Sequence, residues 1–219
     1  MNKFLNYTAI SIWVLYLVVA CQPANADNEI YVTQTGNNLR LEWEQQGQDN
    51  VINTILSGYQ LDTAILQEGN RNQVLKKSQG ITGDYNQVVV EQWNNTNSTD
   101  INKIWIDIDG DSNAVDVGQG CKFLYSNSTS CDRDTHEDAG HEMEINITGD
   151  YNWVRGGQKS GTADPDHTLV MDINSDNNSV WFTQAGSGDK NLDLTINNDG
   201  NSVSIHQHYG AHTATVTLD

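Results

Sequence analysis

The side chains best placed for chemistry are carboxamides, which recur in the order Asn-x-Val-x-x-x-Gln between residues 86 and 207. The five units contain Asn86, Val88 and Gln92; Asn113, Val115 and Gln119; Asn152, Val154 and Gln158; Asn178, Val180 and Gln184; and Asn201, Val203 and Gln207. A carboxamide both donates and accepts hydrogen bonds, so identical Asn or Gln side chains on strands about 4.8 Å apart can bond in a row. The repeat therefore predicts amide ladders with a column of valines beside them.

A Gly-x-x-Asn corner lies at the centre of the clearest units, where Gly83, Gly110 and Gly149 supply the positive φ that a tight turn needs. On both sides of the corner apolar and polar residues alternate, as in 104–109 and 192–197, which is typical of half-buried strands. Two strands cannot bury an apolar face alone, so the units must stack on one another. The pattern predicts an all-β protein, a β-solenoid of strand-turn-strand repeats with two facing sheets.

Upstream, Gln-x-Gly followed by Asn recurs with less even spacing, and we interpret it as further copies of the same repeat. These copies contain Gln34, Gly36 and Asn38; Gln45, Gly47 and Asn50; and Gln67, Gly69 and Asn72.

The spacing between units locates insertions. Successive Asn residues of the five units lie 27, 39, 26 and 23 positions apart, and the longest interval contains Cys121 and Cys131. We expect an insertion at about 120–140, closed by a disulfide between these two cysteines in an oxidising compartment. Insertions at 94–101 and 159–166 are expected at the same edge of the fold.

The N-terminus is typical of a secretion signal, because Lys3 precedes an apolar run that ends near Cys21. Small residues at 24 and 26 fit cleavage before residue 27, whereas a loose lipoprotein box makes lipidation of Cys21 the alternative. We expect a signal over 1–26 and one solenoid domain over 27–219. The mature protein is expected outside the cell or at its surface, with no membrane span, because no second long apolar stretch follows.

The net negative charge of the chain limits the kinds of partner it can bind. The chain has 11 Lys and Arg against 29 Asp and Glu, a net charge of −18, which repels nucleic acid and anionic membranes. Acidic residues at outward positions are interpreted as a solubilising face, with stacked cation sites as the alternative. They include Asp107, Asp116, Glu144, Asp172 and Asp193.

Other residues with chemical potential lack a diagnostic pattern, so we expect no enzyme activity, no metal site and no cofactor. An acidic and histidine-rich cluster follows Cys131, and a second set of histidines lies near the C-terminus; both are interpreted as solvated surface. They contain Asp132, Asp134, His136, Glu137, Asp138, His141 and Glu142, and His206, His208 and His212. Five tryptophans are expected on the outer faces, where they could stack against sugars: Trp43, Trp93, Trp105, Trp153 and Trp181.

The repeat resembles that of curlin, the subunit of bacterial curli amyloid fibres, whose pattern is Ser-x5-Gln-x-Gly-x-x-Asn-x-Ala/Val-x3-Gln. The resemblance extends from about residue 28 to residue 208. Two departures are clear: Asn102, His141, His167 or Lys190 replaces the leading Ser, and Ile replaces the first Gln in the later units.

The resemblance implies secretion by outer-membrane machinery and self-association through terminal rungs, or association with other curlin-like subunits, into fibres of the biofilm matrix. A major subunit, a minor subunit, a nucleator and a relative that does not polymerise all fit it. The hypothesis from another class is a monomeric secreted solenoid that acts as an adhesin or binds carbohydrate.

Overall fold

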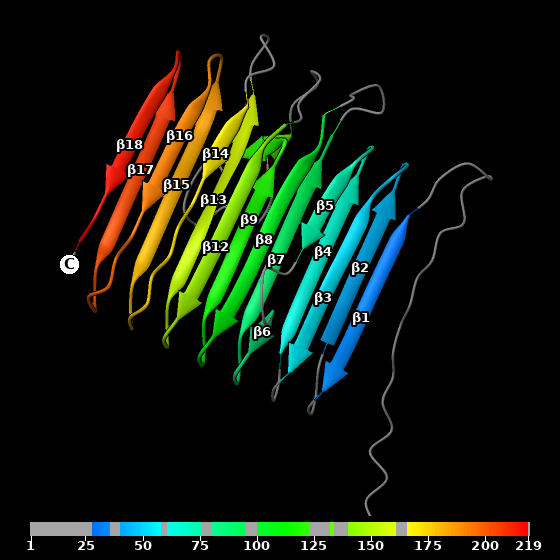
Figure 1. Ribbon diagram of the computed structural model, residues 1–219, viewed down its shortest axis with the longest axis horizontal. Helices are drawn as coiled ribbons and strands as arrows, with labels where there is room; N and C mark the ends of the chain where they lie inside the picture. The colour runs from blue at the N-terminus through cyan, green and yellow to red at the C-terminus, as the bar shows by residue number, and fades with distance from the viewer. Residues whose placement is uncertain are drawn as a thin grey trace, which may run out of the picture.

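The computed structural model describes residues 28–35, 40–57, 61–75, 80–94, 100–122, 132–133, 140–160 and 166–218. These residues form strands β1 to β18 and no helix. Two sheets, each made of parallel strands, face each other, and a two-stranded antiparallel hairpin lies beside them (Figure 1). The predicted all-β solenoid with two facing sheets is confirmed.

The chain passes from one sheet to the other at every turn, so each strand pairs with the strands one rung before and one rung after it. Sheet A contains, in order, β1 (Glu29–Thr35), β3 (Val51–Ser57), β5 (Asn72–Leu75) with β6 (Ile81–Thr82), β8 (Asn102–Asp109), β12 (Glu142–Thr148), β14 (His167–Leu169), β16 (Lys190–Leu194) and β18 (His212–Val216). Sheet B contains β2 (Arg40–Gln46), β4 (Asp62–Glu68), β7 (Gln87–Trp93), β9 (Ala114–Gln119), β13 (Trp153–Ser160), β15 (Ser179–Gly186) and β17 (Ser202–His208). We call the turns that lead from sheet A to sheet B the A-to-B edge, and those that lead back the B-to-A edge.

The core consists of columns of like side chains, because the strands pair in register and alternate residues point inward. In sheet B, Val88, Val115, Val154, Val180 and Val203 follow one another on neighbouring strands. The first four are buried, while Val203 lies on the last strand of sheet B and is half-buried. Sheet A faces them with similar columns, one of which contains Ile104, Met143, Leu169 and Leu192.

One core column of sheet B alternates residue size. Gly156 pairs with Phe182 on the next strand, and the fully buried Phe182 ring occupies the space beside the glycine. A Cβ atom added to Gly156 would lie 2.4 Å from Cδ1 of Phe182 and 2.4 Å from its backbone oxygen. The two residues therefore fill the column together, one providing the volume that the other leaves.

The insertion after β9 forms a hairpin in which β10 (Cys121–Lys122) pairs antiparallel with β11 (Asp132–Arg133). β10 lies against the outer face of sheet B, next to β9 and β13. On this face Gly118, Gly157 and Arg155 are buried, and the Arg155 guanidinium lies 3.0 Å from Asp116. Burial raises the pKa of Asp116, and the charge and hydrogen bond of Arg155 oppose that shift.

The upstream glycine corners occupy a different place in the fold from the later ones. Gly47 and Gly69 lie between a sheet B strand and a sheet A strand, so they are at the B-to-A edge. Gly83, Gly110 and Gly149 lie at the A-to-B edge. The copies at Gly47 and Gly69 therefore lie half a repeat out of phase with the later units, because both edges use a glycine corner followed by Asn. Gly36 and Asn38 of the first upstream copy lie outside the described residues.

The placement of Trp43 on an outer face is also wrong. Trp43 pairs with the buried Ile65 and is only 9% exposed, so its indole belongs to the core. Its neighbours Glu42 and Glu44 are exposed, and their alternation with Trp43 indicates the inward position. The other four tryptophans are half-buried, in strands β7, β8, β13 and β15.

Candidate functional site: amide ladders and terminal strands

The glutamines of the repeat form one continuous ladder inside the solenoid. Each Nε2 donates to Oε1 of the glutamine on the next rung, at distances of 2.7 to 3.0 Å. The ladder contains Gln45, Gln67, Gln92, Gln119, Gln158, Gln184 and Gln207. Its bonds run in one direction, from the N-terminal rung toward the C-terminal rung.

The same glutamines connect the two sheets. Nε2 of Gln119 also donates to the backbone oxygens of Lys103 and His141 in and beside β8 and β12, at 2.8 and 3.0 Å. Gln158 and Gln184 make equivalent contacts with sheet A backbone one and two rungs later. The glutamine column therefore satisfies buried polar groups on both sides of the core, where an unsatisfied group is costly.

A second ladder runs along the A-to-B edge. The backbone N–H of each asparagine donates to Oδ1 of the asparagine on the preceding rung, at 2.8 to 2.9 Å. The ladder contains Asn86, Asn113, Asn152, Asn178 and Asn201. Because a bond joins Asn152 directly to Asn113, the 39-residue interval is one repeat with an insertion.

A third ladder at the same edge consists of aspartates, which the sequence analysis missed. Oδ1 of each Asp accepts a hydrogen bond from the backbone N–H of the Asp on the preceding rung, at 2.7 to 2.9 Å. It contains Asp84, Asp111, Asp150, Asp176 and Asp199. The signal was the Asp that directly follows each corner glycine at 83, 110 and 149. The row places carboxylates of like charge about 4.8 Å apart.

The corner glycines allow these rungs to approach each other closely. Gly110 has φ 144°, and a Cβ atom added there would lie 2.1 Å from the backbone oxygen of Gly149. Gly83 stands in the same relation to Gly110. Tyr85 and Tyr151, two residues after the glycines, also have positive φ, at 58° and 57°, which the sequence analysis did not predict.

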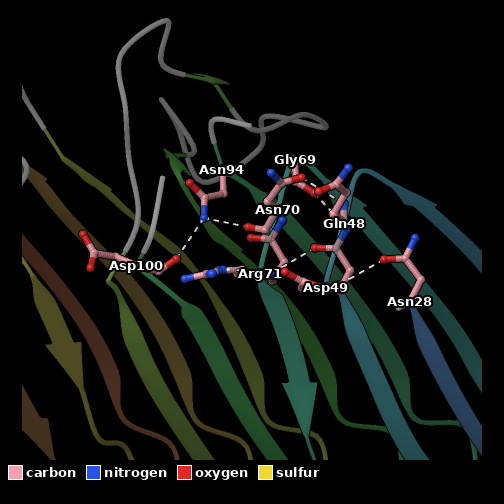
Figure 2. Close-up of polar contacts among 10 residues, drawn as sticks. Asn28, Gln48, Asp49, Gly69, Asn70, Arg71, Asn94 and Asp100 are labelled. Carbon is pink, nitrogen blue, oxygen red and sulfur yellow. Dashed lines mark hydrogen bonds and ion pairs between the residues drawn. The ribbon is translucent and has the colours of Figure 1, made fainter. Parts of the chain in front are cut away.

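The B-to-A edge has polar contacts of the same kind (Figure 2). Oδ1 of Asn28 accepts from the backbone N–H of Asn50, and Oδ1 of Asn50 accepts from that of Asn72. Just outside this row, the backbone N–H of Gln48 donates to Oδ1 of Asn70 at 2.9 Å, and Asn94 donates to the backbone oxygen of Asn70 at 2.7 Å. The edge therefore repeats the arrangement of the opposite edge with asparagine in place of aspartate.

The inner row of this edge changes composition toward the C-terminus. After Asn102, register places His141, His167, Lys190 and His212 in the same column. His141 and His167 are fully buried, with their rings stacked at a centroid distance of 4.8 Å. The interpretation of His141 as a solvated surface residue is wrong, because its side chain lies at an inward position and is fully buried.

Lys190 closes the turn between β15 and β16. Its Nζ donates to the backbone oxygens of Gly186, Ser187 and Gly188, at 3.3, 3.2 and 2.8 Å. Burial lowers the pKa of Lys190, and the neighbouring Asp189 carboxylate opposes the shift. The ammonium therefore has a structural role, in which its three N–H groups match three inward carbonyls.

The terminal rungs leave strand edges that no neighbour pairs within the described residues. β1 and β18 are the outer strands of sheet A, and β2 and β17 are the outer strands of sheet B. The core columns continue to these edges: Ile30 at one end, and Val203, Ile205, Val216 and Leu218 at the other, are partly buried against the core. Unpaired edges with apolar side chains are templates for another chain.

The other sequence candidates are distributed as follows. Asp107, Asp116, Glu144 and Asp172 are half-buried at outward positions, and Asp193 is exposed. Among the described residues, no group of three or more His, Cys, Asp or Glu side chains is arranged to hold a metal ion. The signal region, Cys21, Cys131 and His136 lie outside the described residues, as does the pairing of Cys131 with Cys121.

The fold and its ladders define the class of protein, a parallel two-sheet β-solenoid with polar columns inside. No family model, no curated protein and no solved structure matches the chain. Within the part of the chain that the structure describes, no helix has the length and apolarity needed to cross a membrane. The resemblance to the curlin repeat therefore rests on the residues of the repeat alone.

Proposed function

We propose that the protein is a secreted structural subunit, or an accessory or nucleating subunit, of curli-like extracellular amyloid fibres in a biofilm matrix. The observation that carries the proposal is the continuity of the ladders to both ends. The glutamine ladder begins on β2 and ends on β17, which are both unpaired edge strands among the described residues. A second copy stacked on either end extends the same columns of Gln and apolar side chains without a new type of contact.

The shape of the repeat also supports assembly in one dimension. A solenoid rung buries its apolar face only against its neighbours, so the terminal rungs are incompletely buried in an isolated molecule. Val203 and Ile205 are half-buried on β17, while their column neighbours Val180 and Phe182 on β15 are fully buried. Burying such side chains stabilises by about 25 cal/mol per Å² of apolar surface, which favours joining end to end.

The decisive experiment follows fibre formation by thioflavin fluorescence and electron microscopy of the purified protein. We expect fibres with a cross-β spacing of about 4.8 Å. Val203→Asp places a charge in the apolar column of the terminal strand and should slow elongation by at least tenfold. Ser202→Asp, at the exposed outward position on the other side of Val203, is the matched control and should elongate no more than about twofold more slowly than the parent. Val180→Asp should abolish assembly, because it places the charge in the buried core.

A monomer that stays soluble at all concentrations would contradict the proposal. It would favour the second candidate, a monomeric adhesin or carbohydrate binder, for which the half-buried Trp93, Trp105, Trp153 and Trp181 provide outward aromatic surface. If Val180→Asp and Val203→Asp both polymerised at the parental rate, the inward columns would not set the register of assembly.

A further inference from the structure

We propose that copies join C-terminal rung to N-terminal rung in the register of the repeat, which places His206 of one copy over Glu44 of the next and makes mild acid accelerate joining. This inference rests on the proposed function, because it specifies the partner surface and the regulation of the same terminal strands. Three observations carry it: the direction of the glutamine ladder, the register of sheet B, and the charge of the two ends.

The direction of the glutamine ladder makes the two ends complementary. Every ladder Nε2 donates toward the C-terminal rung. In the last member, Gln207, one amide N–H donates to the backbone oxygen of Asn191 at 3.2 Å, which leaves the second N–H for a further rung at the C-terminal end. The first member, Gln45, has its Oε1 at the N-terminal end. A C-terminal end therefore offers a donor and an N-terminal end an acceptor, whereas two like ends would oppose donor to donor or acceptor to acceptor. The direction of the ladder therefore favours joining of the C-terminal end of one copy to the N-terminal end of the next.

The register of sheet B then determines which outward side chains meet. Thr183 pairs with His206, and the column of Thr183 leads back through β13, β9, β7 and β4 to Glu44 on β2. If the next copy continues this register, Gln45 follows Gln207 and Glu44 follows His206. At about 4.8 Å between strands, an imidazolium and a carboxylate at these positions are close enough for an ion pair.

The titratable side chains of the two ends differ: histidines lie at the C-terminal end and carboxylates at the N-terminal end. Three of the six histidines of the chain, His206, His208 and His212, lie on the last rung and are exposed. The first strand of sheet B presents Glu42 and Glu44 on its outer face, with Arg40 paired to Glu42 at 3.5 Å. In the continued register, Glu42 lies over Ser204 and Arg40 over Ser202, so Glu44 is the carboxylate that meets an imidazole.

Few charged groups surround His206, so a carboxylate brought close by docking should change the pKa of its imidazole. Its ring packs edge-on against Trp181 at 4.4 Å and lies 6.1 Å from the ring of His208, and its Nε2 is 3.0 Å from Oγ of Ser204. β15 has no charged side chain, and the cations Arg155 and Lys159 lie on β13, two strands away in adjacent columns. Partial desolvation of its exposed ring lowers the pKa of His206 in the separate molecule.

The sign of the pH effect follows from linkage. A Glu44 carboxylate facing His206 raises the pKa of the imidazole relative to the separate molecule, so joining takes up a proton. Joining is therefore favoured as the pH falls into the range where the docked imidazole takes up its proton, and the advantage is lost as the pH rises above that range.

The test is seeded elongation at pH 8 and pH 6 at equal ionic strength, followed by thioflavin fluorescence. We expect the parent to elongate about fivefold faster at pH 6, the effect of one partly exposed ion pair. His206→Gln and Glu44→Gln should remove the acceleration. Glu42→Gln, over Ser204, and His208→Gln, over Gln46, are the matched controls and should keep it.

A charge exchange tests the register itself. His206→Glu should block elongation at both pH values by opposing two carboxylates, and adding Glu44→Lys should restore it. If the parent forms fibres but the exchange variant does not, or if His206→Gln keeps the acceleration, this inference is wrong and the proposed function stands. If the parent forms no fibres at either pH, both fail.

Discussion

Phe182 and Gly156 show how single residues maintain the columns of the core. The repeat places an apolar residue at each of these positions, for example Val90 and Val117 on earlier strands. A glycine leaves that column with a gap, and the phenylalanine on the next strand fills it. A small residue on one strand is thus compensated by a large residue on the next, and the column stays filled.

This compensation predicts a partial rescue. Gly156→Val should lower the free energy of unfolding by about 1–3 kcal/mol, because the new side chain overlaps the Phe182 ring. Phe182→Val alone should also destabilise, by about 1–3 kcal/mol, because it leaves a cavity. The double variant should be more stable than Gly156→Val alone, because the ring overlap is gone, but less stable than the parent, because the new Cβ still meets the Phe182 backbone oxygen. The measurement is the urea midpoint of tryptophan fluorescence. Simple additivity of the two losses would show that the side chains do not share the space.

At this scale the sequence predicted most of what the structure contains. The Asn, Val and Gln columns follow from spacing alone, because a fixed spacing on stacked strands gives alignment. Lys190 and Trp43 did not follow from it. Their side chains are polar or amphipathic and common on surfaces, and their inward positions depend on acceptors and volumes supplied by other rungs.

Turns are the elements in which the two edges of the solenoid differ. At the A-to-B edge the corners from 83–86 to 198–201 are short and carry the Asn and Asp ladders. At the B-to-A edge the connections before β8, β12 and β14 are long. The sequence predicted insertions there, but the change in phase between the upstream and downstream glycines was missed, because both edges use the same Gly and Asn signal.

The stacked corners predict a difference between two glycines of the same edge. Gly110→Ala should lower the thermal midpoint strongly, because its Cβ would overlap the Gly149 carbonyl in addition to a φ of 144°. Gly200→Ala is the matched control: φ is 76°, and nothing lies within 4 Å of the added Cβ. We expect a cost of about 1–2 kcal/mol for Gly200→Ala and at least twice that for Gly110→Ala. Equal midpoints in circular dichroism would contradict the close stacking.

The whole molecule carries a net charge of −18, and part of it is concentrated in the aspartate ladder. Four of the five carboxylates accept a backbone hydrogen bond, yet neighbouring carboxylates in the row repel one another. The stability of the folded protein therefore depends on the balance between these hydrogen bonds and the repulsion. Salt weakens the repulsion, because raising ionic strength from about 0.01 to 0.15 M shortens the screening length from about 30 to 8 Å.

Two results should follow from this balance. The thermal midpoint of the unassembled protein should rise with salt over that range. Asp111→Asn keeps the Oδ1 acceptor for the Asp84 N–H but removes one charge from the middle of the row, so it should raise the midpoint and weaken the salt dependence. A midpoint that falls with salt, or an Asp111→Asn variant with the parental salt response, would show that the row does not limit stability.

The long connections at 94–101, 120–141 and 161–166 all join a sheet B strand to a sheet A strand. Copies joined head to tail would place the described ends of these segments along one edge of the fibre, repeated at each molecular length. Seven sheet B strands at about 4.8 Å correspond to roughly 34 Å per copy. Such a fibre would be a polyvalent array, in which a ligand that binds one loop weakly in a single subunit is held by many at once.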